Sequence, residues 1–134
     1  MIVVDTNIIG YLYLTSEYSA QAEALYRKAP AWAAPLLWLS ELRNVLAYYL
    51  RRQLLRLSDA TRIMGAATNL VAGREFQVPT LPVLELVTKC ACSAYDCEFV
   101  ALALALKSPL VTVNRQILEQ FPAVAIGLEE YLAS

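Results

Sequence analysis

Three carboxylates occupy positions that their neighbours in the sequence mark as buried. Asp5 follows the β-branched run IVV at residues 2–4, a pattern typical of a short buried strand. Glu41 lies on an apolar stripe of a predicted helix, because most residues one turn before and after it are apolar. Asp96 begins an alanine- and leucine-rich helix and also has apolar residues one turn further along its face. Since an unpaired buried carboxylate is unfavourable or takes up a proton, three such acids indicate a functional site.

A polar residue ends a second apolar run in the same way. The segment LVTVNRQIL at residues 110–118 is similar to IVVDTNIIG at residues 2–10: an apolar strand, a polar residue at its carboxyl end, and then a helix. If the two strands are parallel neighbours, Asn114 lies near Asp5, and Thr112 lies close by. Carboxylates gathered in a low-dielectric site stay ionised only with a cation among them. Oxygen ligands without nitrogen or sulfur suit Mg²⁺ or Mn²⁺, which can activate water for attack on a phosphodiester.

Each acid also has an ordinary structural explanation. A glutamate at a helix edge can reach water or pair with an arginine, and Asp96 in a first helical turn suits the helix dipole. Asp5 would also fit a haloacid-dehalogenase-like phosphatase, in which a strand ends at a nucleophilic aspartate. That pattern requires a second aspartate two residues later, where this sequence has Asn7, and a lysine for which Lys107 is a poor match. Glu98 is expected to point away from the other acids and into solvent.

The composition excludes several other kinds of site. The chain has no histidine, so neither a Ser-His-Asp triad nor a histidine-ligated metal can be present. It has four glycines and no glycine-rich phosphate-binding motif. Cys90, Cys92 and Cys97 are expected to be reduced thiols, since a zinc site would need a fourth ligand. No transmembrane segment or signal peptide is recognised, so a cytoplasmic location without a membrane partner is expected.

The candidate site residues are carried by strand-like and helical segments that alternate along the 134 residues. Strands are predicted at residues 2–4, 31–34, 75–78, 110–113 and 124–126. Helices are predicted at residues 8–14, 20–29, 35–53, 59–72, 82–92, 95–107, 115–120 and 128–132, with Pro35 opening the third and Ser58-Asp59 capping the fourth. This alternation favours one α/β domain with a mainly parallel sheet, in which sites form at the carboxyl ends of strands near a switch in strand order. Asp5 is at such a strand end.

The chain is apolar for a single domain of its size. Hydrophobic residues make up 58% of the sequence and charged residues only 17%. The helix that begins at Pro35 is apolar nearly all round, which leaves Leu39, Leu46 or Tyr49 without an evident internal partner. We therefore expect a homodimer whose interface includes part of residues 36–56.

Taken together, the motifs resemble the PIN-domain ribonucleases, in particular the small VapC-type toxins of toxin–antitoxin pairs. The resemblance covers nearly the whole chain and rests on VVDTNIIG, SELRNVL and YDCEFVALALALKSPLVTVNRQIL, which follow the order and spacing of the family. It implies a three-layer α/β/α fold with a mainly parallel twisted sheet of four or five strands. It also implies that Asp5, Glu41 and Asp96 bind Mg²⁺ or Mn²⁺ and that Asn7 and Thr112 support the site.

The implied activity is metal-dependent hydrolysis of RNA phosphodiester bonds by a toxin that pairs with itself and is covered by a cognate antitoxin protein. The sequence departs from the family at Asn114, where a further aspartate is usual. An amide oxygen can still ligate Mg²⁺ or hold a water, but it brings no charge, so metal affinity is expected to fall. Asn114 is thus a fourth candidate catalytic residue. The alternative is a weakly active or inactive PIN-fold binding module.

Arginines are the candidate RNA contacts, because the net charge of −1 gives no general attraction to nucleic acid. Arg51 and Arg52 belong to the basic run that follows the Glu41 helix, and Arg43 and Arg115 lie near the proposed site in the sequence. Arginine pairs well with phosphate. For the basic run, a solvated helix end whose arginines complement the dipole is an equally good explanation.

Overall fold

Five strands form one sheet in the order β3-β2-β1-β4-β5. The computed structural model describes residues 1–134. Its strands are β1 (Ile2–Val4), β2 (Trp32–Pro35), β3 (Glu75–Phe76), β4 (Leu110–Thr112) and β5 (Ala125–Gly127). Every neighbouring pair of strands is parallel. The predicted parallel sheet is confirmed, and each of the five predicted strands is present.

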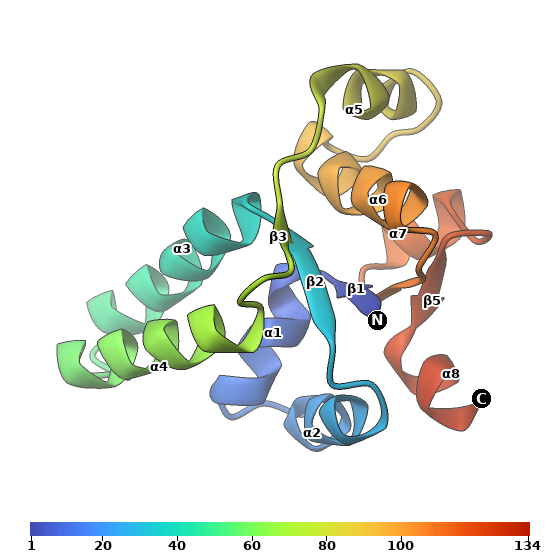
Figure 1. Cartoon of the computed structure of the whole chain (residues 1–134). Coiled ribbons are helices and arrows are strands. Elements are labelled where there is room, and N and C mark those ends of the chain that lie inside the picture. The colour runs from blue at the N-terminus through green and yellow to red at the C-terminus, as the bar shows by residue number, and fades with distance from the viewer.

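Helices cover both faces of this sheet (Figure 1). They are α1 (Thr6–Tyr13), α2 (Ser19–Lys28), α3 (Leu37–Arg51), α4 (Leu57–Leu70), α5 (Thr80–Val87), α6 (Ala94–Leu106), α7 (Arg115–Gln120) and α8 (Leu128–Ala133). Ile2 and Val4 face an apolar core shared with α1 to α4 and α8, whereas Val3 faces a second core shared with α5, α6 and α7. The predicted three-layer α/β/α fold is therefore confirmed. None of these helices combines the length and the hydropathy needed to cross a membrane.

The strand order switches between β1 and β4. The chain builds β2 and β3 on one side of β1 and then returns to build β4 and β5 on the other. Val4 of β1 is paired with Val111 of β4, so the carboxyl ends of the two strands lie side by side. The condition under which Asn114 was expected near Asp5, that the two strands are parallel neighbours, is therefore met, and the residues that follow each strand meet at one edge of the sheet.

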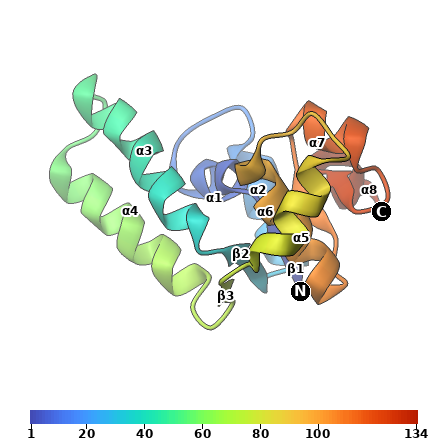
Figure 2. The same ribbon diagram turned by 90° about the horizontal axis from the view of Figure 1, so that it is seen from above.

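The helices α3 and α4 run alongside each other and project together from one side of the sheet (Figures 1 and 2). The expectation that Leu39, Leu46 or Tyr49 lacks an internal partner is wrong. Leu46 is buried, and Leu39 and Tyr49 are partly buried against the same core, to which α4 also contributes. The exposed apolar residues of this hairpin are Leu36, Tyr48, Leu54 and Leu57.

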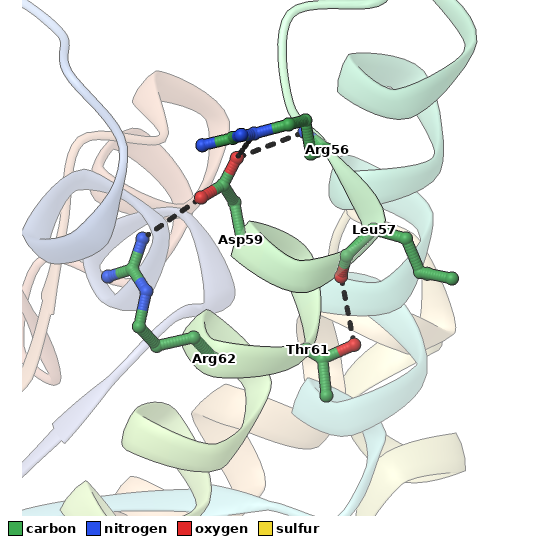
Figure 3. Close-up of polar contacts among 5 residues, drawn as sticks. All are labelled: Arg56, Leu57, Asp59, Thr61 and Arg62. Carbon is green, nitrogen blue, oxygen red and sulfur yellow. Dashed lines mark hydrogen bonds and ion pairs between the residues drawn. The ribbon is translucent and has the colours of Figure 1, made fainter.

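The predicted roles of Pro35 and of Ser58-Asp59 at helix starts are wrong. Pro35 is the last residue of β2, and pairing with β3 continues past it because the Leu36 N–H donates to the Phe76 carbonyl at 3.0 Å. Ser58 is not the cap of α4, which begins at Leu57. Instead Asp59 accepts the backbone N–H of Arg56 at 3.1 Å and pairs with the guanidinium groups of Arg56 and Arg62 (Figure 3). This arrangement satisfies a free N–H at the helix start.

The helix predicted at 82–92 is shorter and starts earlier than expected. It is α5, residues Thr80–Val87, and Pro82 lies in its first turn, where a missing N–H does no harm. The chain then forms a loop at 88–93, and Ser93 caps α6 by accepting the backbone N–H of Asp96 at 3.0 Å. This loop leads directly into the site.

Candidate active site

A cavity of about 500 Å³ opens at the strand ends, between the first turns of α1 and α6 and the first half of α3. It is lined by Asp5, Thr6, Asn7, Leu37, Ser40, Glu41, Asn44, Val45, Tyr95, Asp96, Phe99 and Asn114, and we call it the acidic cavity. It contains all four predicted catalytic residues and Asn7. Thr112 is not among the lining residues and lies behind Asp5.

Asp5 is the most buried of the three acids, and both of its oxygens accept hydrogen bonds. As the N-cap of α1 it accepts the backbone N–H of Ile8 at 3.2 Å, and the Thr112 hydroxyl donates to its other oxygen. Burial raises the pKa of Asp5 from 3.8 to about 6, despite the lowering effect of these two hydrogen bonds. The negative charges of Glu41 and Asp96 raise that pKa further. The ionised carboxylate is therefore disfavoured without a cation beside it.

Thr112 and Asn114 connect β4 to this carboxylate. Thr112 is completely buried, and its hydroxyl also accepts the backbone N–H of Asn114 at 3.0 Å. The side-chain oxygen of Asn114 accepts the backbone N–H of Ile117 at 3.1 Å, so Asn114 is the N-cap of α7 just as Asp5 is the N-cap of α1. Asn114 thus has a structural role as a helix N-cap, which aspartate would also perform.

Glu41 is half-buried and accepts a hydrogen bond of 2.6 Å from the Thr6 hydroxyl. Burial raises its pKa, the Thr6 hydrogen bond lowers it, and the charge of Asp96 raises it. The sequence reasoning missed Thr6. Its signal was a hydroxyl residue placed directly after Asp5, at the turn from a strand into a helix.

Asp96 is the third residue of α6 and faces the same cavity. Burial raises its pKa, and hydrogen bonding to Ser93 lowers it. Glu98 was expected to point away from the other acids and into solvent, and only the second part of this expectation is wrong. Glu98 is partly buried, and both its burial and the charge of Glu41 raise its pKa, although it does not line the cavity.

The acids of the cavity have no cationic side chain to balance them. No lysine or arginine lines it, and Asp59, on α4, is the only acid in the structure that forms ion pairs. The donors present are carboxylate, amide and hydroxyl oxygens, which is the ligand chemistry of Mg²⁺ or Mn²⁺. The charge and donor type therefore fit a divalent cation.

The positions of the carboxylate groups are less favourable for a metal. The structure contains no group of three acidic or cysteine side chains that could hold a metal ion as it stands. Instead, the Glu41 carboxylate accepts a hydrogen bond from the Thr6 hydroxyl, and the Asp5 carboxylate accepts one from the Thr112 hydroxyl. A cation would have to draw the carboxylates toward a common point. That Asp5, Glu41 and Asp96 share one metal ion stays a prediction.

The predicted RNA-binding arginines are all exposed and lie outside the acidic cavity. Arg115 is the residue after Asn114, at the start of α7. Arg43 lies on α3, and Arg51 and Arg52 lie at its far end, where the Arg52 guanidinium stacks over the Tyr48 ring at 3.6 Å. Their role in binding RNA stays a prediction.

Two other groups are not part of this site. Lys107 lines a separate cavity at the opposite end of α6, so it cannot serve the Asp5 chemistry that a haloacid-dehalogenase-like phosphatase would need. All three cysteines are free thiols, with the Cys90 sulfur 3.6 Å from that of Cys97. Burial raises the pKa of Cys92 to about 11 and that of Cys97 to about 12, which makes both thiols unreactive.

Comparison with known proteins agrees with this geometry. The family model of the PIN domain matches residues 2–124. Ribonuclease VapC3 of Pyrobaculum aerophilum is 30% identical over 126 residues, which cover 92% of this chain and 96% of that protein. The crystal structure of PAE2754 from the same organism superposes with a TM-score of 0.72 at 21% identity and covers 98% of this chain and 93% of that one. The crystal structure of FitAcB from Neisseria gonorrhoeae gives a TM-score of 0.72 at 17% identity, with coverages of 96% and 99%. At these identities the two structures establish the fold alone. The match to the family model and the identity to Ribonuclease VapC3 show that the chain belongs to the PIN domain family.

Proposed function

We propose that this chain is a Mg²⁺- or Mn²⁺-dependent endoribonuclease and the toxin of a toxin–antitoxin pair. The observation that carries the proposal is the acidic cavity, in which Asp5, Glu41 and Asp96 face one space without a cationic side chain. Membership of the PIN domain family and the similarity to a protein named Ribonuclease VapC3 support the same activity.

The three acids would hold the metal ion, with Asn7 and Thr112 in supporting roles. A bound divalent ion would polarise the phosphodiester and lower the pKa of a water so that it can attack phosphorus. Thr6 donates to one oxygen of Glu41, which leaves the other oxygen free for a metal ion. Both oxygens of Asp5 accept a hydrogen bond, from Thr112 and from the Ile8 N–H, so Asp5 would bind the metal through a remaining lone pair. Because the pKa of Asp5 is about 6, metal binding competes with a proton, and affinity should rise with pH through that value.

RNA would reach this cavity over a surface that carries arginines. From Glu41 to Arg51 is ten residues of α3, about 15 Å along a helix, which a few nucleotides can span. Arg115 is next to Asn114 at the other side of the cavity. Arg43 is two residues from Glu41 and so projects from another side of α3, where it could contact only a more distant part of the RNA. The acids themselves repel phosphate, so the metal and these arginines must together overcome that repulsion.

The experiment is cleavage of a labelled single-stranded RNA with Mg²⁺, with Mn²⁺ and with a chelator. Activity should require the metal and should fall at least about 100-fold in Asp5→Asn, Glu41→Gln and Asp96→Asn, a loss typical for a catalytic metal site. Glu23→Gln is the matched control, because Glu23 is an exposed acid on α2 outside the cavity. Cleavage that does not require a metal ion would disprove the proposal, as would three variants that are each as active as the wild type.

An inactive binding module is the second candidate, and two observations favour it. Asn114 replaces the usual acid, and no three acids stand in a metal-binding arrangement. Calorimetric titration separates the two candidates. Binding of Mg²⁺ or Mn²⁺ that Asp96→Asn abolishes supports the enzyme, whereas no binding at millimolar metal supports the binding module.

A further inference from the structure

Tyr95 is the one aromatic residue at the acidic cavity that solvent reaches freely. Its side chain is 62% exposed, whereas Phe99, the other aromatic residue of the lining, is buried. The ring has no aromatic neighbour and no cation over it, in contrast to Tyr11, Tyr26 and Tyr48, which are engaged within the fold. Packing therefore does not account for a large aromatic side chain at this position.

The position of Tyr95 relative to the acids gives it a chemical context. It directly precedes Asp96 in the first turn of α6, where Ser93 fixes the backbone by capping the helix. A ligand in the cavity that contacts the Tyr95 ring therefore contacts the residue next to Asp96, one of the proposed metal-binding acids. The cavity, at about 500 Å³, falls within the range of ligand pockets and has room for a nucleotide.

The lining of the cavity also limits how RNA can be held there. It contains no arginine or lysine, so no cationic side chain inside the cavity can bind phosphate, and only the proposed metal ion could do so there. A base, by contrast, presents an uncharged face to which an exposed tyrosine ring is complementary, and such stacking tolerates any base. Ser40 and Asn44 line the cavity from α3 and offer hydrogen-bonding groups for the base edge.

We propose that Tyr95 stacks on an unpaired base next to the cleaved phosphodiester and so selects single-stranded RNA. The inference rests on the proposed ribonuclease function and adds a specificity-determining residue to it. A base inside a duplex already stacks on its neighbours and cannot present its face to Tyr95. Single-stranded or looped RNA is therefore the substrate class, and the preference should be strongest where the stacked base is a purine with its larger ring.

The test is a binding measurement in which stacking itself is observed. A short single-stranded RNA that contains aminopurine, a fluorescent adenine analogue quenched by stacking, is titrated with the protein in Ca²⁺, which slows hydrolysis. The wild-type chain should quench the probe, and Tyr95→Ala should bind about 5- to 100-fold more weakly with little quenching. Tyr95→Phe should keep both binding and quenching, because it keeps the ring. Leu104→Ala, at an exposed position of α6 outside the acidic cavity, is the control and should behave as the wild type.

Turnover gives a second measurement. With Mn²⁺, Tyr95→Ala should raise KM for single-stranded RNA with a smaller effect on kcat, because Asp96 and the other acids are retained. If the wild type binds and cleaves RNA but Tyr95→Ala quenches the probe equally well, the stacking role is overturned and the ribonuclease proposal stands. If the wild type neither binds nor cleaves RNA, both proposals are overturned.

Discussion

Thr112 holds Asp5 in place across the boundary between β1 and β4, because its buried hydroxyl donates a hydrogen bond to the Asp5 carboxylate. The same hydroxyl accepts the backbone N–H of Asn114 at 3.0 Å. One side chain thus fixes the acid at the end of β1 and the start of the loop that follows β4. The switch in strand order is what makes this contact possible, since it brings the two strand ends together.

Thr112→Val should therefore disturb the site, although the substitution barely changes the size of the side chain. Valine has the same shape but cannot donate to Asp5 or accept from Asn114, so two buried groups lose a partner, at about 1–3 kcal/mol each. The free energy of unfolding should fall, and the pKa of Asp5 should rise above about 6 because a hydrogen bond that lowers it is lost. Chemical denaturation as a function of pH measures both effects. Thr112→Ser, which keeps the hydroxyl, is the control; a valine variant as stable as the serine variant would contradict the prediction.

Without metal, the protein should be less stable at neutral pH than in mild acid. The pKa of Asp5 is about 6 in the folded chain and 3.8 as an isolated group, so the folded state holds the proton more tightly. The resulting stabilisation is complete below about pH 3.8 and is lost as pH rises toward and through about 6, a total of about 3 kcal/mol. Glu41 and Asp96 also have raised pKa values and act in the same direction.

Denaturation in a chelator at about pH 5 and about pH 7.5 measures this effect, which should be on the order of 1–2 kcal/mol between the two. Asp5→Asn should remove most of the difference and should stabilise the metal-free chain at neutral pH. Asp59, on the surface, has a lowered pKa and loses its stabilising contribution only at lower pH, so it does not contribute in this range. A stability that increases over this range would contradict the assignment of Asp5.

Asn114→Asp should strengthen metal binding without altering the fold. Aspartate caps a helix as well as asparagine does, so the bond to the Ile117 N–H can be kept. The added carboxylate would be a fourth acid on the cavity, and affinity for Mn²⁺ should rise by about tenfold, or about 1.4 kcal/mol. In the chelator the same variant should be less stable than the wild type, since like charges repel. Calorimetry and RNA cleavage measure the gain; equal metal affinity would mean that the missing charge is not limiting.

Much of the site could be predicted because its residues follow recognisable strands and helices. Asp5 and Asn114 each follow a strand and cap a helix, and that local pattern predicts that they meet if their strands are neighbours, a condition that the structure satisfies. The helical periodicity around Glu41 and Asp96 correctly assigned both to the interior side of their helices, where they line the cavity. Helical periodicity predicts on which side of a helix a side chain lies.

The remaining features depend on contacts between elements that the sequence does not specify. The direction of the Glu41 carboxylate is decided by Thr6, a residue 35 positions earlier on another helix. Leu46 appeared to lack a partner because nothing in the sequence indicated that α4 would fold back along α3. Likewise, Pro35 looked like a helix start because its strand partner, Phe76 of β3, lies 41 positions further along the chain. Residue type and spacing predict which groups face inward, but tertiary packing decides what each of them touches.

The exposed apolar residues of the α3–α4 hairpin predict self-association. Leu36 is 52% exposed, Tyr48 51%, Leu54 61% and Leu57 72%, whereas the other large apolar residues of the hairpin pack against the core. Covering them with a second copy removes that surface from water, and a twofold dimer that uses part of residues 36–56 is the commonest way to do so. Light scattering at micromolar concentration should report about twice the 14.9 kDa chain mass. Leu54→Lys should shift the equilibrium to monomer, whereas Leu104→Lys, at a 49% exposed site near the end of α6, should not. A monomeric wild type would refute the dimer, and equal effects of the two lysines would place the interface elsewhere.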